Sequence, residues 1–200
     1  MTSTKLTYVF DAYCGWCYGF APALHELAQD EGIDIEVISG GLFSGHHAGP
    51  IGALPHIPGA NARIAALTGV RFGEAYETVL SDGTLHMDSD DAGTGLVALK
   101  EASGGKDLDM AAAMQQAFYI DGLSLSDTGT YRTIATREGL DPDVVESSTP
   151  IPAPGKRHCR NRNALQISES TATPPSSCTQ LQVRLESVAR FTQPSNCARH

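Results

Sequence analysis

The sequence lacks three features that would direct it to a membrane, an export pathway or a nucleic acid. No stretch of its 200 residues approaches the roughly 20 apolar residues of a membrane span. The N-terminal segment MTSTKLTYVFDAY has a five-residue apolar run and one lysine, too little for a signal peptide. The net charge of −9 gives no attraction to phosphate backbones or anionic lipid. These absences predict a cytoplasmic protein with no membrane partner and no nucleic-acid partner.

The sequence also lacks a disulfide framework. It holds five cysteines, an odd number, in a chain without a recognisable export signal. Cys14 and Cys17 are separated by two residues in the segment YVFDAYCGWCYGFAP, whereas Cys159, Cys178 and Cys197 stand singly. The close pair is therefore the candidate for chemistry.

The residues around the pair predict a strand, a helix and a second strand. KLTYVF, residues 5–10, is β-branched and aromatic, and IDIEVISGG, residues 33–41, alternates apolar and acidic positions. Between them, Phe20, Leu24 and Leu27 recur at helical spacing. This order predicts two parallel strands, with the cysteines at the start of the connecting helix.

Further along the chain the periodicity becomes helical and then stops. Five segments between residues 59 and 146 each predict a short helix that glycine ends. Residues 1–146 hold 7 basic and 21 acidic side chains, whereas residues 147–200 hold 7 and 2 and are rich in Ser, Thr, Pro and Arg. We therefore divide the chain into residues 1–45, which contain the cysteine pair, a helical insertion over 46–146, and a tail over 147–200 that we expect to be disordered.

Two cysteines at this position are typical of a redox pair. A helix N-terminus stabilises negative charge, so we expect a lowered pKa for Cys14, with Cys17 one turn further in to resolve a mixed disulfide. A zinc site is the first alternative, but no second CxxC supplies the missing ligands. The second alternative is a pair of buried thiols with no chemical role. On the redox interpretation no metal or cofactor is expected, and the partners are protein or small-molecule thiols and disulfides.

FDAYCGWCYGF, a proline five residues beyond the second cysteine, and GGLF after the second strand resemble the DsbA family of the thioredoxin superfamily, in particular its FrnE-like branch. The resemblance spans about residues 5–146. It implies an α/β, thioredoxin-like fold with an inserted all-helical domain. It also implies thiol–disulfide oxidoreductase activity with Cys14 as the nucleophile and Cys17 as the resolving thiol.

The tail departs from this family. Its members return to the sheet through a cis-proline loop and two further strands, and no such pattern follows residue 147, so we expect the C-terminal part of the sheet to be missing. The change of charge at the same place leads to the hypothesis that the tail is a frame-shifted reading. Permitted codons for ESTATPPSSCTQ, read from the third base of the Ser168 codon, give RIDGYPTLVVHA, which has the order of a cis-proline loop and a strand. The alternative is a divergent, disordered tail.

Two other functions compete with the oxidoreductase interpretation. One is a glutathione-dependent isomerase or transferase of the same superfamily, although those branches carry serine where Cys14 stands. The other is a catalytically silent interaction or chaperone module that binds partners through its acidic helical region. Retained binding without thiol activity would identify this second alternative.

Overall fold

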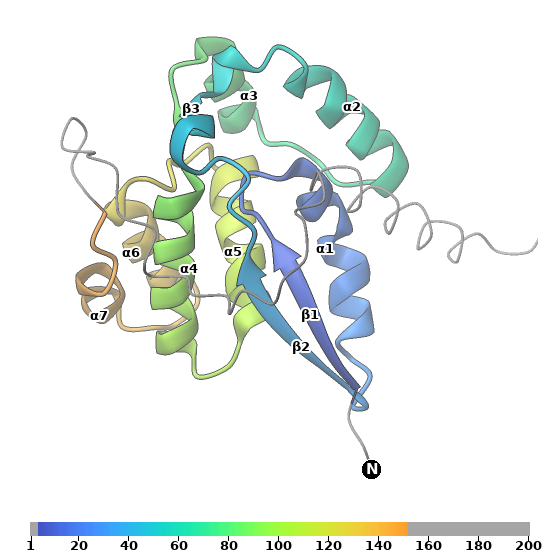
Figure 1. Ribbon diagram of the computed structural model, residues 1–200, viewed down its shortest axis with the longest axis vertical. Helices are drawn as coiled ribbons and strands as arrows, with labels where there is room; N and C mark the ends of the chain where they lie inside the picture. The colour runs from blue at the N-terminus through green and yellow to red at the C-terminus, as the bar shows by residue number, and fades with distance from the viewer. Residues whose placement is uncertain (1–3, 152–200) are drawn as a thin grey trace, which may run out of the picture. The chain divides into compact units, whose positions relative to one another are not determined.

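The computed structural model describes residues 4–151. Its strands are β1 (Thr4–Phe10), β2 (Ile33–Ser39), β3 (Gly49–Pro50) and β4 (His86–Met87). Its α-helices are α1 (Gly15–Leu27), α2 (Ile57–Thr68), α3 (Glu74–Asp82), α4 (Ser89–Ser103), α5 (Asp107–Tyr119), α6 (Thr128–Arg137) and α7 (Pro142–Ser147), and two 3-10 turns span Gly45–His47 and Ile51–Ala53. Figure 1 shows their arrangement.

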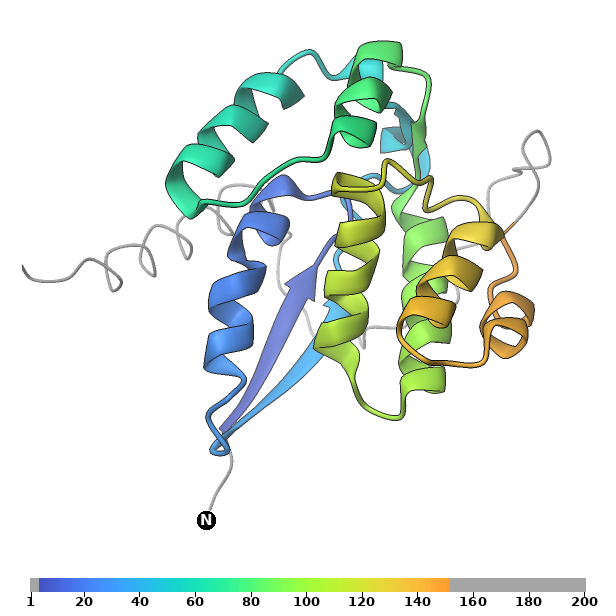
Figure 2. The same cartoon turned by 180° about the vertical axis from the view of Figure 1, so that it is seen from behind.

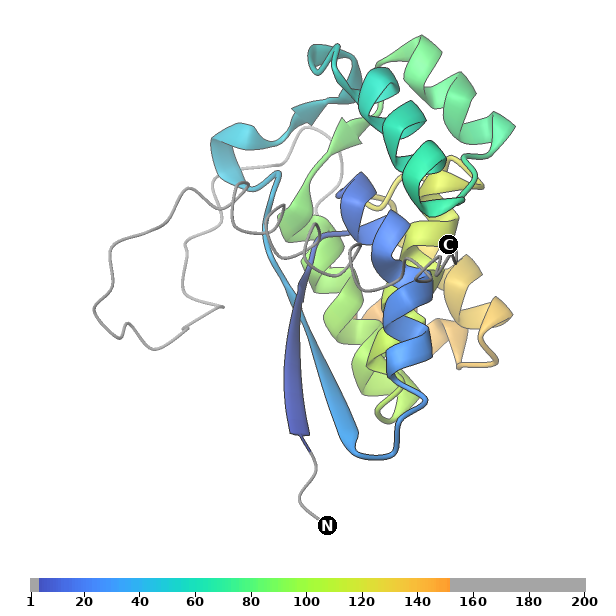
Figure 3. The same ribbon diagram turned by 90° about the vertical axis from the view of Figure 1, so that its right-hand side faces the viewer.

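The two long strands form the predicted unit with α1 between them. β1 and β2 pair in parallel, in a register that runs from Thr4 opposite Ile33 to Phe10 opposite Ser39. Helices α1, α4 and α5 lie on one face of this sheet (Figure 3), and α4 and α5 both contact β2. Seen from behind, α1 and α5 stand side by side (Figure 2) and are in contact. The strand, helix, strand prediction is confirmed.

The predicted helical insertion contains the expected helices and one feature that periodicity did not reveal. Glycines with positive φ angles follow or end the helices, as at Gly69 (φ 77°) and Gly83 (φ 69°). β3 and β4 form a short antiparallel pair inside this region, so it is not entirely helical as predicted. Two-residue strands are too short to produce an alternating pattern. The boundaries at residues 45 and 146 remain predictions.

The end of the described structure is still packed. The side chain of Thr149 is 1% exposed, and its hydroxyl donates to the Val145 carbonyl at 2.7 Å. Ordered packing therefore continues a few residues beyond the boundary near 147. Within the described residues the main sheet has two strands, β1 and β2. The prediction that the chain from 152 onward is disordered, and the frame-shift hypothesis for it, lie outside the described residues.

Candidate active site

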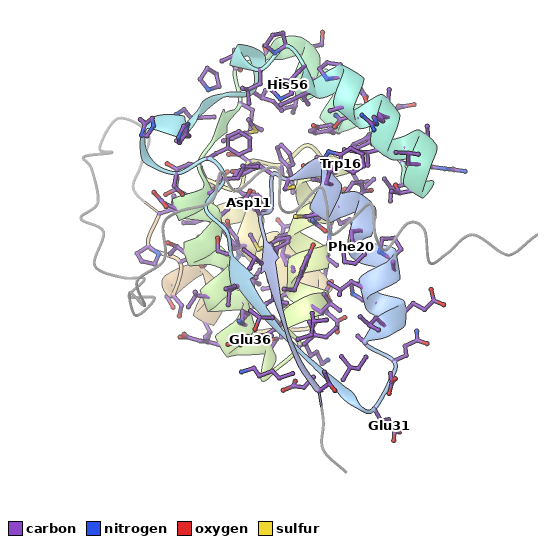
Figure 4. All side chains as sticks on the ribbon, turned by 45° about the vertical axis from the view of Figure 1, so that its right-hand side comes forward. Asp11, Trp16, Phe20, Glu31, Glu36 and His56 are labelled. Carbon is purple, nitrogen blue, oxygen red and sulfur yellow. The ribbon has the colours of Figure 1, made fainter. Side chains whose placement is uncertain are left out.

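The loop after β1 places the first cysteine. Asp11 makes the turn: its carbonyl accepts from the Cys14 amide at 3.0 Å, and its carboxylate accepts from the Tyr13 amide at 3.0 Å. The second carboxylate oxygen accepts from the Leu42 amide at 2.8 Å. Asp11, 5% exposed, thus ties the loop after β1 to the loop after β2. Figure 4 shows it at the end of the strand, close to the start of α1.

Cys14 and Cys17 lie where the sequence predicted. Cys14 is the N-cap residue of α1 and has an extended backbone, and its carbonyl accepts from the Tyr18 amide at 3.1 Å in the first helical turn. Both cysteines are free thiols. Cys14 is partly exposed, whereas Cys17 is 2% exposed. A disulfide in solution therefore has access to Cys14 and not to Cys17.

The two thiols interact directly, and this contact sets their acidity. A hydrogen bond from the Cys14 thiol lowers the pKa of Cys17. The same contact, followed by burial, raises the pKa of Cys14 well above its usual value. The expectation of a lowered pKa for Cys14 is wrong in this respect. It considered only the helix N-terminus, whereas the neighbouring thiol and the loss of solvent outweigh that effect.

Tyr8 and Asp11 complete the polar surroundings of the pair. The Tyr8 hydroxyl donates to the Cys17 carbonyl at 3.4 Å, and the phenol also helps to lower the pKa of Cys17. Burial raises the pKa of Asp11, opposed by hydrogen bonds from Ser89, Leu42 and Tyr13. The Asp11 charge in turn raises the pKa of both cysteines, as the smallest contribution to each. Sequence reasoning missed both residues. The fold brings Tyr8 to the thiols, and Asp11, although only three residues before Cys14, is buried and tied to the loop after β2 only in the fold.

Aromatic side chains next to the two cysteines pack against α5. Tyr13 is 5% exposed and packs edge-on against Phe118 with ring centroids 4.9 Å apart. Tyr18 stacks on the buried Tyr119 at 4.6 Å and donates to the Arg71 carbonyl at 2.7 Å. These contacts show ordinary packing for Tyr13 and Tyr18, and they anchor the start of α1 to α5.

Helix α2 covers the two residues between the cysteines. A Cβ atom on Gly15 would lie 2.8 Å from Ile64 Cδ1, and one on Gly19 would lie 2.8 Å from Ile64 Cγ2. The two glycines therefore allow α1 and α2 to approach closely. The guanidinium carbon of Arg63 lies 5.9 Å from the centroid of the Trp16 ring. Figure 4 shows Trp16 at the start of α1, beneath α2.

The described part of the chain contains neither a cluster of metal-binding side chains nor a helix suited to cross a membrane. Residues 4–151 hold no group of three or more His, Cys, Asp or Glu side chains placed to bind a metal ion. Among the helices in the same range, none combines the length and the apolar character that a membrane crossing requires.

Comparison with known proteins adds a family and several related structures. The family model described as the DSBA-like thioredoxin domain matches residues 5–168. The cytosolic disulfide reductase DsbM from Pseudomonas aeruginosa is similar with a TM-score of 0.65 and 26% identity, over 74% of this chain and 71% of that one. Its structure with GSH aligns with a TM-score of 0.64 and 30% identity, over 74% and 72%.

A more distant structure shares the fold. A candidate protein disulfide isomerase from Nitrosomonas europaea aligns with a TM-score of 0.61 and 19% identity, over 74% of this chain and 71% of that chain. No curated protein sequence matches this chain.

Proposed function

Because this chain belongs to the DSBA-like thioredoxin domain family, we propose that it exchanges disulfides through Cys14 and Cys17 and that glutathione is one of its substrates. The family match and the reductase among its neighbours make it an enzyme of the thiol–disulfide oxidoreductase class. The observation that carries the proposal is the pairing of a partly exposed thiol at the N-cap of α1 with a buried thiol one turn further in.

The exchange proceeds in two balanced steps. The Cys14 sulfur, after its proton moves to the neighbouring Cys17 thiolate, attacks one sulfur of the substrate disulfide. A mixed disulfide forms and the other substrate sulfur leaves as a thiolate. Cys17 then loses its proton to that thiolate or to water and attacks the Cys14 sulfur. This step releases the second substrate thiol and leaves a Cys14–Cys17 disulfide, so two electrons have passed from the pair to the substrate.

Glutathione as the source or acceptor of those electrons is supported by the DsbM structure with GSH, which shares 30% identity with this chain. Two glutathione thiols would reduce the Cys14–Cys17 disulfide and leave as glutathione disulfide, which closes the cycle. We also propose that the enzyme acts in the cytosol, because the similar DsbM is a cytosolic disulfide reductase. Cysteine at position 14 supports exchange over the transferase alternative, whose branches carry serine there.

The test uses a background in which Cys159, Cys178 and Cys197 are serine, so that only the pair can react. We expect this protein to reduce glutathione disulfide, Cys17→Ser to accumulate a glutathione adduct on Cys14, and Cys14→Ser to do neither. Mass spectrometry of the quenched reactions locates the adduct. Exchange by Cys14→Ser at the rate of the background protein would refute the assignment.

A further inference from the structure

One turn of α2 contacts both residues that separate the cysteines. Arg63 lies over the ring of Trp16, and Ile64 lies against Gly15, where a Cβ atom would be 2.8 Å from Ile64 Cδ1. Asn61 Oδ1 is 3.5 Å from the position of a Gly15 Cβ. This turn of α2 therefore lies against Gly15 and Trp16, the two residues that follow Cys14, and the cation in it is Arg63.

The charge of Arg63 is available to a ligand. Four other basic side chains form ion pairs with acidic partners, namely Lys5, Lys100, Arg132 and Arg137. Within residues 4–151 no ion pair involves Arg63, whose side chain is exposed. Residues 1–146 hold only 7 basic side chains against 21 acidic ones. Three of these seven, Arg63, Arg71 and Lys106, form no ion pair within residues 4–151. Arg63 is the one that lies over Trp16, between the two cysteines in the sequence.

We infer that Arg63 is a specificity residue that receives a carboxylate of a small anionic thiol or disulfide of the glutathione class while its sulfur meets Cys14. The inference rests on the function proposed above. A guanidinium binds a carboxylate through two parallel hydrogen bonds, and stacking on an aromatic ring leaves its N–H edge free to do so. Trp16 holds the guanidinium in place, and the substrate supplies the negative charge that residues 4–151 do not.

The competing explanation is that Arg63 only helps α2 to pack on α1 through Trp16. A packing role does not depend on the charge of the ligand, whereas carboxylate recognition does. S-methylglutathione separates the two, because its thioether cannot exchange and its binding is independent of turnover. Trp16 is the only tryptophan of the chain, so its fluorescence reports binding at this position.

We would titrate the full chain, Arg63→Gln and Lys106→Gln with S-methylglutathione and with its diester. Both carboxyl groups of the diester are esterified and carry no charge. Lys106 is exposed at the start of α5, and its replacement makes the same change in net charge as that of Arg63. We expect Arg63→Gln to weaken binding of S-methylglutathione about fivefold, the scale of a surface carboxylate pair, and less at high salt. Lys106→Gln should bind as the parent does, and the diester should bind all three proteins equally.

Equal affinity of Arg63→Gln and the parent for S-methylglutathione would overturn the inference. An equal loss of affinity for the diester would do the same, because it would indicate a packing role. So would a parent protein that does not bind S-methylglutathione. None of these results affects disulfide exchange by the Cys14–Cys17 pair, so failure of the inference is distinguishable from failure of the proposed function.

Discussion

At the scale of the residue, accessibility and acidity belong to different cysteines. Cys14 is the more exposed thiol, and Cys17, which is 2% exposed, has the lowered pKa. Exposure of one thiol and a lowered pKa of the other are compatible, because the two sulfurs share a hydrogen bond along which one proton can pass. In the proposed mechanism, once the pair has lost one proton, the negative charge rests mainly on the Cys17 sulfur, and the attack comes from the Cys14 sulfur.

We predict two well-separated thiol titrations in the reduced protein. The first should fall below the free-thiol pKa of about 8.5, because Cys14 donates to the Cys17 thiolate, and the second well above it. Thiolate absorbance against pH, in the background without the tail cysteines, measures both. In Cys14→Ala the remaining thiol loses its donor, so its pKa should rise relative to the first titration of the pair. Two thiols that titrate together near 8.5 would disprove the shared proton.

The sequence indicated some of these residues and could not indicate others. The CxxC spacing after a β-prone run and before a helical pattern was sufficient to place Cys14 and Cys17 at the start of α1. Tyr8 reaches the pair only because β1 and α1 pack together, and Asp11, three residues before Cys14, is buried by its contact with the loop after β2. Arg63 comes from a helix some fifty positions away in the chain. No local pattern encodes such contacts, so sequence reasoning found the thiols and missed the groups that tune them.

At the scale of the element, α1 and α2 approach closely, and α2 covers the residues between the two cysteines. Both glycines on this face of α1 contact Ile64, but in different ways. Gly15 faces Cδ1, the free end of a side chain that can rotate away. Gly19 faces Cγ2, which is fixed near the backbone, and Thr68 lies 3.1 Å from the same position. The helices were predictable from their 3.6-residue period, whereas this approach depends on what lies opposite each glycine.

We predict that Gly19→Ala lowers the free energy of unfolding by about 1–3 kcal/mol, the usual cost of an overpacked contact. Gly15→Ala is the matched control and should change stability by less than about 1 kcal/mol, because Ile64 Cδ1 can move and alanine favours a helix. Urea denaturation measures both. Adding Ile64→Ala to Gly19→Ala should cost less than the sum of the two changes. Equal losses for the two glycines, or strict additivity, would refute this packing account.

Also at this scale, Lys100 protects the outer strand. Its ammonium donates to the Val37 carbonyl of β2 at 2.6 Å and pairs with Asp107 at 2.8 Å. Unpaired carbonyls on a strand edge invite association with another chain, and a lysine from α4 occupies one of them here. A strand pattern in the sequence gives the strand but not the partner of its edge, which explains why this contact was not predicted.

At the scale of the whole molecule, the described structure and the family match end at different places. The structure describes residues 4–151 with two strands in its main sheet, and the family match runs to residue 168. Sequence reasoning predicted the α/β unit and the helical insertion, because apolar periodicity specifies both. Where that periodicity stops, near residue 147, only charge and composition remain, and these predict neither strands nor contacts.

The frame-shift hypothesis for the tail is tested on the gene itself. Suppose that residues from about 147 onward are read in a shifted frame. An alternate forward frame of the gene should then encode a string similar to GYPT, followed by β-branched residues. Sequencing the gene across the codons for residues 140–200 provides the measurement. A gene with no such string in either alternate frame would refute the hypothesis and leave a divergent tail.

The central claim is that Cys14 and Cys17 form one reversible two-electron couple, and a redox titration tests it most directly. The protein without the tail cysteines is equilibrated in glutathione buffers, quenched with acid, and scored by mass spectrometry for the disulfide linking residues 14 and 17. We predict a single two-electron transition between about −200 and −270 mV, the range of reducing members of the superfamily, because no cation stands between the two cysteines to stabilise a thiolate. A pair that forms no linked disulfide at any glutathione ratio would contradict the account.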